Sequence, residues 1–329
     1  MILAGDIGGT NARLACFQSQ NGHLRLVSER VFPSREHSEL GEIVNEFLED
    51  ADTRPKAACF GIAGPVLNGR VETSNLPWII EQKQLAKKIH LPATLLINDL
   101  EATAWGIGAL SASDLVALNS ITHPAVGNQA VVAPGTGLGE AGLFWDGHRH
   151  HVFACEGGHA DFAPQGDLQI DLLRYLKTRF GHVSYERILS GPGLVNVYEF
   201  LTETGCGKES HEVAAAITKK HDAAAAISQA AFDDSSSRAA KALEIFISVF
   251  GAEASNLALK TMATGGIFLA GGISPKILAK LTGPLFLHAF QDKGRLRPLL
   301  EAIPVQVVTN EKAGLLGAAR CASVGSNQK

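Results

Sequence analysis

The stretch that decides the fold is Gly5-Asp6-Ile7-Gly8-Gly9-Thr10-Asn11, close to the N-terminus. The apolar run before it predicts a buried strand, and residues 12–17 predict a second strand. Between two strands, consecutive glycines let backbone N–H groups approach an anion closely, because no Cβ stands in the way. A tight hairpin turn also favours Gly-Gly. This stretch alone supports an anion-binding loop and a plain turn equally.

Length and composition describe an ordinary globular protein of 329 residues, 46% hydrophobic and 19% charged. The length favours two domains. A net charge of −4 gives no reason to expect nucleic acid or an anionic membrane as a partner, and no apolar run reaches the roughly 18 residues of a membrane span. The N-terminus begins as a strand rather than a signal peptide, so a cytoplasmic protein is expected. The 5 scattered cysteines, with no CxxC pair, predict free thiols and disfavour a zinc site.

Strands alternate with helices over residues 1–110, which indicates a mixed sheet with helices packed on its faces. The strand–glycine loop–strand plan of residues 2–17 recurs at residues 130–145, a weak internal duplication. Beyond residue 166 the pattern is mostly helical, until a strand at 305–308 and a helix at 313–322. The other expected helices are about 38–50, 80–90, 167–179, 185–189, 193–203, 211–230 and 236–262.

Two more glycine-rich loops follow predicted strands, at Gly135-Thr136-Gly137 and at Gly271-Gly272. Three such loops favour a nucleotide site over three unrelated turns. The chain has no GxxxxGKS or GxxxxGKT segment, which excludes a P-loop NTPase. Residues 137–142 fit GxGxxG, but that fingerprint requires a helix to follow, and residues 141–147 predict a strand and a turn. A dehydrogenase built on these residues is therefore disfavoured.

The pair Asn98-Asp99 follows a buried strand and is the best catalytic candidate, because open α/β folds place ligands at strand ends. An Asp there can accept a proton from a substrate hydroxyl during phosphoryl transfer, with Asn98 orienting the same alcohol. The competing interpretation is a helix N-cap, since Asp favours the position before residues 100–102. The motif standing by itself favours capping.

The segment Glu156-Gly157-Gly158-His159 follows another predicted strand. A carboxylate and an imidazole suit vicinal hydroxyls, because together they offer acceptors and a donor. For His159 the alternatives are a loop histidine satisfied by backbone, or a metal ligand, which is disfavoured because only Cys155 lies nearby. Taken alone, Glu186 predicts nothing beyond a helix surface.

Taken together and in this order, nine segments resemble the bacterial ATP-dependent glucokinase family, within the hexokinase and actin superfamily. They cover nearly the whole chain, so the match is far more specific than any one glycine loop. Residues 162–166 stand where the broader ROK sugar kinases carry a cysteine-rich zinc motif, which places the resemblance in the glucokinase group. The segments are LAGDIGGTNARLA (3–15), GIAGPV (61–66), SNLPW (74–78), INDLEATAWG (97–106), APGTGLGEA (133–141), EGGHADFAP (156–164), ERILSGPGL (186–194), LAGGI (269–273) and AGLLGAA (313–319).

The resemblance implies an α/β fold of two actin-like, ribonuclease H-like domains, with mixed β-sheets flanked by helices around a central cleft. It implies glucokinase activity: MgATP phosphorylates D-glucose at the 6-hydroxyl to give glucose 6-phosphate and ADP, with cleft closure on sugar binding. ATP and Mg²⁺ are the implied cofactors, and a homodimer is expected from the family alone. The implied boundaries are 1–109 with 305–322 for the smaller domain, 110–304 for the larger, helix-rich domain, and 323–329 for a flexible tail.

Carried over position by position, the family pattern makes Asp99 the general base and lets Asp6 position Mg²⁺ through water. None of the positions departs from the pattern. The implied sugar-binding residues are Asn75, Asn98, Asp99, Glu156, His159 and Glu186. The implied nucleotide-binding residues are Asp6, Gly8, Gly9, Thr10 and Asn11 around the first phosphate loop, Gly135, Thr136 and Gly137 in the second, and Gly271 and Gly272 against adenosine.

Other functions stay open at this point. A related hexose or N-acetylhexosamine kinase would use the same chemistry, and a non-catalytic sugar sensor would use the same fold. A sugar-responsive repressor needs an N-terminal DNA-binding segment, and this chain starts at its first predicted core strand.

Overall fold

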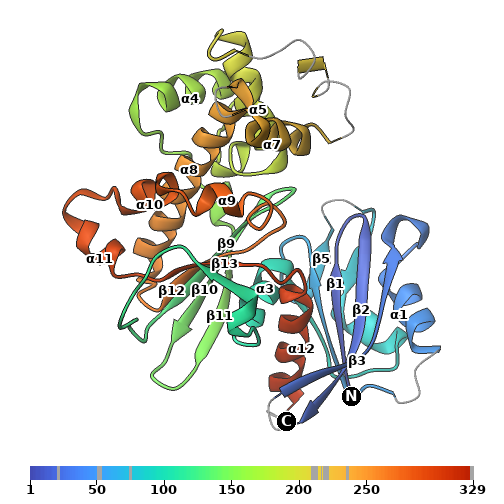
Figure 1. Ribbon diagram of the computed structural model, residues 1–329. Coiled ribbons are helices and arrows are strands. Elements are labelled where there is room, and N and C mark those ends of the chain that lie inside the picture. The colour runs from blue at the N-terminus through green and yellow to red at the C-terminus, as the bar shows by residue number, and fades with distance from the viewer. Residues whose placement is uncertain are drawn as a thin grey trace. The chain divides into compact units, whose positions relative to one another are not determined.

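The computed structural model describes residues 1–20, 23–49, 54–73, 76–208, 214–215, 217, 222–234 and 237–326 (Figure 1). The chain divides into two compact units. Unit 1 consists of Met1–Asp114, Val152–Ala154 and Asn310–Lys329. Unit 2 consists of Leu115–His151 and Cys155–Thr309.

Unit 1 is built on a five-stranded sheet with the order β3-β2-β1-β4-β7. The central strand β1 (Ile2–Ile7) pairs antiparallel with β2 (Asn11–Gln20) and parallel with β4 (Ala57–Ile62). At the edges, β7 (Thr94–Asn98) lies parallel to β4, and β3 (His23–Pro33) pairs with β2. Because β1 and β4 are buried on both faces, β4 is a continuous apolar run and β1 is apolar up to Asp6, rather than alternating.

Helices cover both faces of this sheet, as the alternation of strands and helices predicts. Successive side chains of a strand point to opposite faces, so Leu3 packs in one core with α1 while Ala4 packs in another with α12. The remaining elements of unit 1 are η1 (Ser34–Glu36), α1 (Leu40–Glu49), β5 (Arg70–Glu72), β6 (Ile79–Glu81), α2 (Gln82–Lys88), α3 (Asp99–Ile107), η2 (Ala112–Asp114) and α12 (Ala313–Ser326).

Helices α3 and α12 approach each other closely at small residues. A Cβ on Gly106 would overlap the carbonyl oxygen of Ala313, and a Cβ on Gly317 would overlap that of Ala102. The atoms in the way belong to helix backbone, which cannot move aside as a flexible side chain can. The contact therefore fixes the C-terminal helix against the helix that begins at Asp99.

Gly317→Ala is expected to lower the free energy of unfolding by about 1–3 kcal/mol, because the added methyl group forces two packed helices apart. The matched control is Gly314→Ala on the same helix, where the nearest atom to the added Cβ is Thr103 Oγ1 at 3.5 Å, an ordinary contact. That variant should keep or slightly raise stability through helix propensity. Urea unfolding of both variants checks this, and equal stabilities would contradict the close-contact explanation.

Unit 2 is built on a six-stranded sheet with the order β11-β10-β9-β12-β13-β8. Strand β9 (Gln129–Pro134) pairs antiparallel with β10 (Leu138–Trp145) and parallel with β12 (Gly266–Leu269). Strand β12 also pairs parallel with β13 (Val305–Val308). The β9–β10 hairpin thus repeats the β1–β2 hairpin of unit 1, as the duplicated sequence plan predicts. The edge strands are β8 (Leu115–Ala117) and β11 (His150–Cys155).

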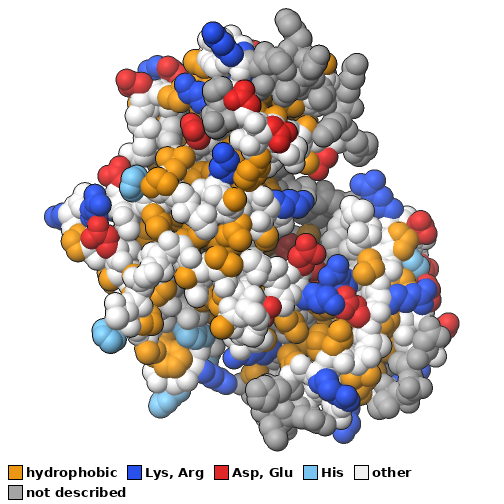
Figure 2. Space-filling model, viewed as in Figure 1, with side chains coloured by type: hydrophobic (Ala, Val, Ile, Leu, Met, Phe, Trp, Pro, Cys, Tyr) orange, Lys and Arg blue, Asp and Glu red, His pale blue; other side chains and the backbone are white. Residues whose placement is uncertain are grey.

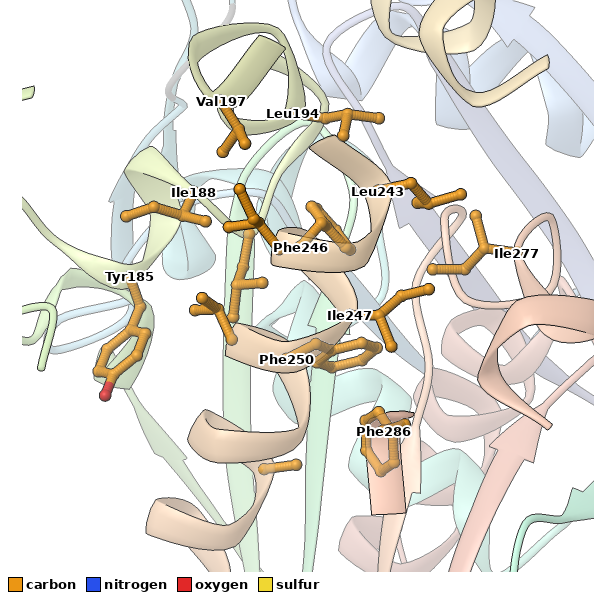
Figure 3. Close-up of a cluster of buried hydrophobic side chains, with 14 of the residues drawn as sticks. Tyr185, Ile188, Leu194, Val197, Leu243, Phe246, Ile247, Phe250, Ile277 and Phe286 are labelled. Carbon is orange, nitrogen blue, oxygen red and sulfur yellow. The ribbon is translucent and has the colours of Figure 1, made fainter. Parts of the chain in front are cut away.

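The long helix α8 (Arg238–Thr261) runs through the core of unit 2, where Phe246 and Phe250 contact side chains from several other elements (Figure 3). By length and composition it is apolar enough to cross a membrane, yet 72% of its apolar window is buried inside the structure. A core helix meets the same criterion. The other helices and turns of unit 2 are η3 (Gly157–His159), α4 (Gly166–Phe180), η4 (Tyr185–Arg187), α5 (Gly191–Glu203), α7 (Ala223–Asp233), α9 (Leu278–Leu281), α10 (Pro284–Gln291), η5 (Gly294–Leu296) and α11 (Arg297–Glu301).

The structure departs from the sequence expectations at several elements. Strand β13 joins the sheet of unit 2, whereas we expected residues 305–308 to complete the smaller domain; an apolar strand pattern does not specify which sheet it enters. The predicted helix at 185–189 is a short 3₁₀ turn. Strands β5, β6 and β8 were not predicted, because three residues carry no usable period. The expected helix 211–230 and the expected tail 323–329 lie partly outside the described residues.

Charged side chains of both signs are interspersed on the face of the protein shown in Figure 2. The described residues also form exposed ion pairs, such as Arg70 with Glu72 at 2.8 Å and Arg297 with Glu301 at 2.7 Å. Exposed pairs of this kind each contribute about 0–1 kcal/mol to stability. A surface of mixed sign also produces no strong field of one sign on that face.

Candidate active site

The carboxyl ends of three parallel strands meet in unit 1 and bring the predicted catalytic residues to one edge of the sheet. The strand register aligns Ile7 of β1 with Ile62 of β4, and Ile62 with Asn98 of β7. Asp6 is the last residue but one of β1, and Asp99 directly follows β7. Open α/β sheets bind ligands at this edge, so the topology supports the sequence argument for both residues.

The first glycine loop is the connection between β1 and β2. The Gly8 N–H donates a hydrogen bond to the carbonyl oxygen of Asn11 at 2.9 Å, and the Ser34 hydroxyl donates to the carbonyl oxygen of Gly8 at 2.9 Å. Thr10 and Asn11 are exposed. The predicted hairpin is therefore confirmed, while the binding of phosphate by residues 8–11 stays a prediction.

Asn98, rather than Asp99, is the N-cap of helix α3. Its Oδ1 accepts hydrogen bonds from the Leu100 N–H at 2.8 Å and the Glu101 N–H at 3.4 Å, and its Nδ2 donates to the carbonyl oxygen of Gly64 at 3.1 Å. Capping does occur in this motif, but one residue earlier than the sequence suggested. The cap fixes the backbone at Asp99, whose Oδ1 accepts from the Leu100 N–H at 2.9 Å.

The carboxyl group of Asp6 is largely removed from water. Burial raises the pKa of Asp6 above its usual range, and the neighbouring Arg13 lowers it only in part. A divalent cation would offset the cost of burying the negative charge of Asp6. Because Asp6 is a single carboxylate, Mg²⁺ bound there would take its other ligands from water and phosphate oxygens. The described ranges contain no group of three His, Cys, Asp or Glu side chains placed to hold a metal. Asp6 therefore fits a hydrated Mg²⁺ and does not fit a site made of protein ligands alone.

In unit 2 the second glycine loop and the turn after β12 lie against each other, because β9 and β12 are parallel neighbours. Gly271 has φ +79°, and a Cβ there would overlap the carbonyl oxygen of Pro134, so only glycine fits. The Ile273 N–H donates a hydrogen bond to the same oxygen at 3.2 Å. No atom lies within 4 Å of where a Cβ would be on Gly135 or Gly272, so both glycines face open space.

The turn η3 packs against the end of the second glycine loop. A Cβ on Gly158 would overlap the carbonyl oxygen of Leu138, so the close approach depends on that glycine. The His159 ring has Nε2 4.0 Å from a carboxylate oxygen of Glu156 and Nδ1 4.0 Å from one of Glu186. Glu186 Oε2 also accepts a hydrogen bond from the Leu138 N–H at 2.9 Å. Acceptors and a donor for hydroxyl groups are thus collected beside the glycine loop.

A family model described as Glucokinase matches residues 3–324 of the chain. A glucokinase from Nostoc sp. is 41% identical over 338 residues, which cover 98% of this chain and 99% of the relative. The chain belongs to the glucokinase family. A solved glucokinase from an Antarctic psychrotroph is similar with a TM-score of 0.85 and 30% identity, over 98% of each chain. A ROK family glucokinase from Streptomyces griseus, solved in complex with glucose and AMPPNP, matches with a TM-score of 0.63 and 23% identity, over 98% of this chain and 99% of that one.

Membership of the glucokinase family confirms the recognition made from the sequence, the mixed α/β fold class and the predicted class of enzyme, an ATP-dependent sugar phosphotransferase. The likeness to the Streptomyces griseus protein shows the fold alone.

Sequence reasoning about this glucokinase family member missed one residue next to the site. Glu140 of β10 is 2% exposed and lies directly beneath η3. The available signal was a charged residue within the otherwise apolar strand Leu138–Trp145. Asn75 lies outside the described residues.

Proposed function

We propose that this chain transfers the γ-phosphoryl group of MgATP to the 6-hydroxyl of D-glucose, giving glucose 6-phosphate and ADP. The observation that supports this most is in unit 2, where the glycine loop at 135–137, the Gly271-Gly272 turn and the His159 carboxylate cluster are built side by side. Nucleotide-binding and hydroxyl-binding groups are needed together in a sugar kinase. We take glucose as the sugar from the names of the relatives, and ATP as the phosphoryl donor from the family.

Asp99 would be the general base of the reaction. As the 6-hydroxyl oxygen forms its bond to the γ-phosphorus, the hydroxyl proton passes to Asp99, and the bond from phosphorus to the β,γ-bridging oxygen breaks to release ADP. The cap made by Asn98 supports this role, because it fixes the first turn of α3 from which Asp99 projects. Asn98 Nδ2 uses one hydrogen for Gly64 and keeps a second for a sugar hydroxyl.

The remaining sugar hydroxyls would be bound by Glu156, His159 and Glu186, with Asn75 beside them. Each of these groups makes its full set of hydrogen bonds only with a sugar that carries the matching hydroxyl. Once closure excludes water from the site, an analogue without that hydroxyl would leave one of these polar groups unpaired, which costs about 1–3 kcal/mol. Sugar choice would follow from this cost.

The nucleotide would be held by backbone N–H groups of residues 8–11 and 135–137, with Gly271 and Gly272 against adenosine. These loops would hold the phosphates in line with the sugar and leave room for them where no Cβ projects. Mg²⁺, held through water by Asp6, would neutralise charge on the transferred phosphoryl group.

The two-domain assignment belongs to the proposal, with residues 1–109 and 313–322 in the smaller domain and with β13 in the larger domain, whose sheet it joins. Closure of the two domains on the sugar would exclude water, which would otherwise compete as an acceptor. A homodimer and a cytoplasmic location are proposed from the family.

The test is an ADP-release assay of the purified protein with glucose, mannose, fructose, N-acetylglucosamine and galactose. Glucose is expected to give the highest kcat/KM, by a factor of about 10 or more over each other sugar, since each lacks or misplaces a hydroxyl partner. A higher kcat/KM with N-acetylglucosamine or another hexose than with glucose would identify the protein as a related hexose or N-acetylhexosamine kinase. Sugar binding without any ADP release would identify a non-catalytic sensor.

A further inference from the structure

Two buried carboxyl groups meet beneath the turn η3. Glu140 on β10 is 2% exposed and Glu253 on α8 is 0% exposed, and the two side chains are within hydrogen-bonding reach of each other. Glu140 Oε1 and Glu253 Oε1 are both buried, and neither has a hydrogen-bond donor among the described residues. Carboxylate oxygens only accept hydrogen bonds, so these two can satisfy each other only if one carboxyl carries a proton.

The groups around the pair do not balance two negative charges. The side chain of Lys260 is 58% exposed, and its Nζ lies 3.9 Å from Glu253 Oε1. Burial, and after it the neighbouring Glu253, raise the pKa of Glu140 to about 8, and Lys260 opposes this only in part. The groups that face the pair or its neighbours are Lys260 and Asn256 on α8, Tyr185 on η4, Lys293 after α10, and Cys155 with Glu156 at the end of β11.

The pair is in direct contact with the segment that carries the proposed sugar-binding residues. A Cβ on Gly157 would overlap Glu140 Oε2, so the Glu140 carboxyl lies against the backbone between Glu156 and His159. On the other side, Asn256 Nδ2 donates hydrogen bonds to Glu253 Oε2 and to the Tyr185 hydroxyl, each at 2.9 Å.

Tyr185 connects the pair to the hydrophobic core of unit 2. Figure 3 shows its ring at the edge of the buried cluster, with the hydroxyl pointing away from the other labelled side chains. Its neighbour in the chain is Glu186, which accepts the Leu138 N–H and faces His159. The same buried network therefore supports η3 from below and η4 from the side.

We propose that Glu140 and Glu253 share one proton, and that this singly charged pair positions Glu156 and His159 for sugar binding. The inference rests on the proposed function, because it takes residues 156–159 as part of the sugar site. When the proton is lost, two carboxylates in contact repel each other in a site that water does not reach. Glu140 then moves against Gly157, and the residues on either side lose their positions.

The test compares the wild type with Glu140→Gln, measuring glucose KM, kcat and nucleotide-free glucose binding by calorimetry from about pH 6.5 to about pH 9.5. One unit above the pKa of Glu140 about a tenth of the pairs keep the proton, so wild-type glucose KM should rise about tenfold between pH 7 and pH 9. The amide of Gln donates a hydrogen bond to Glu253 at every pH, so the variant should keep its low-pH KM throughout. Glu199→Gln, which removes an exposed carboxylate, should follow the wild type.

Two results would overturn the proposal that Glu140 and Glu253 share a proton. One is a Glu140→Gln protein whose glucose KM rises with pH as steeply as that of the wild type. The other is a difference in Tm between variant and wild type that does not change with pH. The pKa of Glu140 is raised from 4.5 to about 8 in the folded state, so wild-type stability should fall as pH rises through that range, and the Gln variant should lose this fall. If neither the wild type nor the variants bind glucose at any pH, the proposed function is wrong. The pH dependence of Tm still tests whether Glu140 and Glu253 share a proton.

Discussion

Replacing Asp99 with alanine is expected to lower kcat for glucose phosphorylation by about three orders of magnitude, while glucose still binds with nearly unchanged affinity. General-base catalysis acts on the transition state, so its loss appears in kcat rather than in ground-state binding. Asp99→Asn is the closer test, because the amide keeps the shape and an acceptor for the Leu100 N–H but cannot take a proton. Coupled ADP release gives kcat, and calorimetry gives glucose affinity.

Glu101, in the same first turn of α3 as Asp99, provides the control for this experiment. Glu101→Gln also removes a carboxylate from the first turn of α3, so it reproduces any loss of favourable helix-dipole interaction. We expect it to keep kcat within about twofold, since capping by Asn98 remains intact. An Asp99→Ala protein that turned over glucose at the wild-type rate would show that another group takes the proton.

Much of the fold could be predicted because its strands carry strong local signals. β4 is an unbroken apolar run, β1 is apolar up to Asp6, and the β1–β2 and β9–β10 hairpins each surround a glycine-rich turn. Partner choice could not be predicted in the same way. Residues 305–308 have an ordinary strand pattern, and only the hydrogen bonds to β12 and β8 show which sheet they join.

Part of the candidate site could be predicted from the sequence. Glycines mark close approaches such as those of Gly158 to Leu138 and Gly271 to Pro134, and only the structure names the partner in each contact. Which of residues 98 and 99 caps the helix could not be predicted either, because Asn and Asp are both good caps, and the structure shows that it is Asn98. Glu140 could not be interpreted at all without Glu253, which lies 113 positions further along the chain and meets it only in the folded core.

Glu186→Ala is expected to raise glucose KM by about 10–100-fold, because it removes two interactions at once. The Leu138 N–H loses its hydrogen-bond acceptor in a buried position, and the His159 ring loses the carboxylate 4.0 Å from Nδ1. An unsatisfied buried N–H alone costs about 1–3 kcal/mol, which is enough to displace the end of the second glycine loop. Steady-state kinetics with glucose and ATP varied separately measures the effect on each substrate.

Glu186→Gln separates the two contributions to this loss. Its amide oxygen can still accept from the Leu138 N–H, so the loop stays in place, while the negative charge beside His159 is gone. We therefore expect a smaller rise in glucose KM for Gln than for Ala, and an ATP KM that changes only in the Ala variant. Equal effects of Gln and Ala on both substrates would mean that charge alone matters, and wild-type glucose KM in Glu186→Ala would remove Glu186 from the sugar site. The exposed Glu199→Ala, which breaks an ion pair with Arg179 on the surface, is the control that should leave both KM values unchanged.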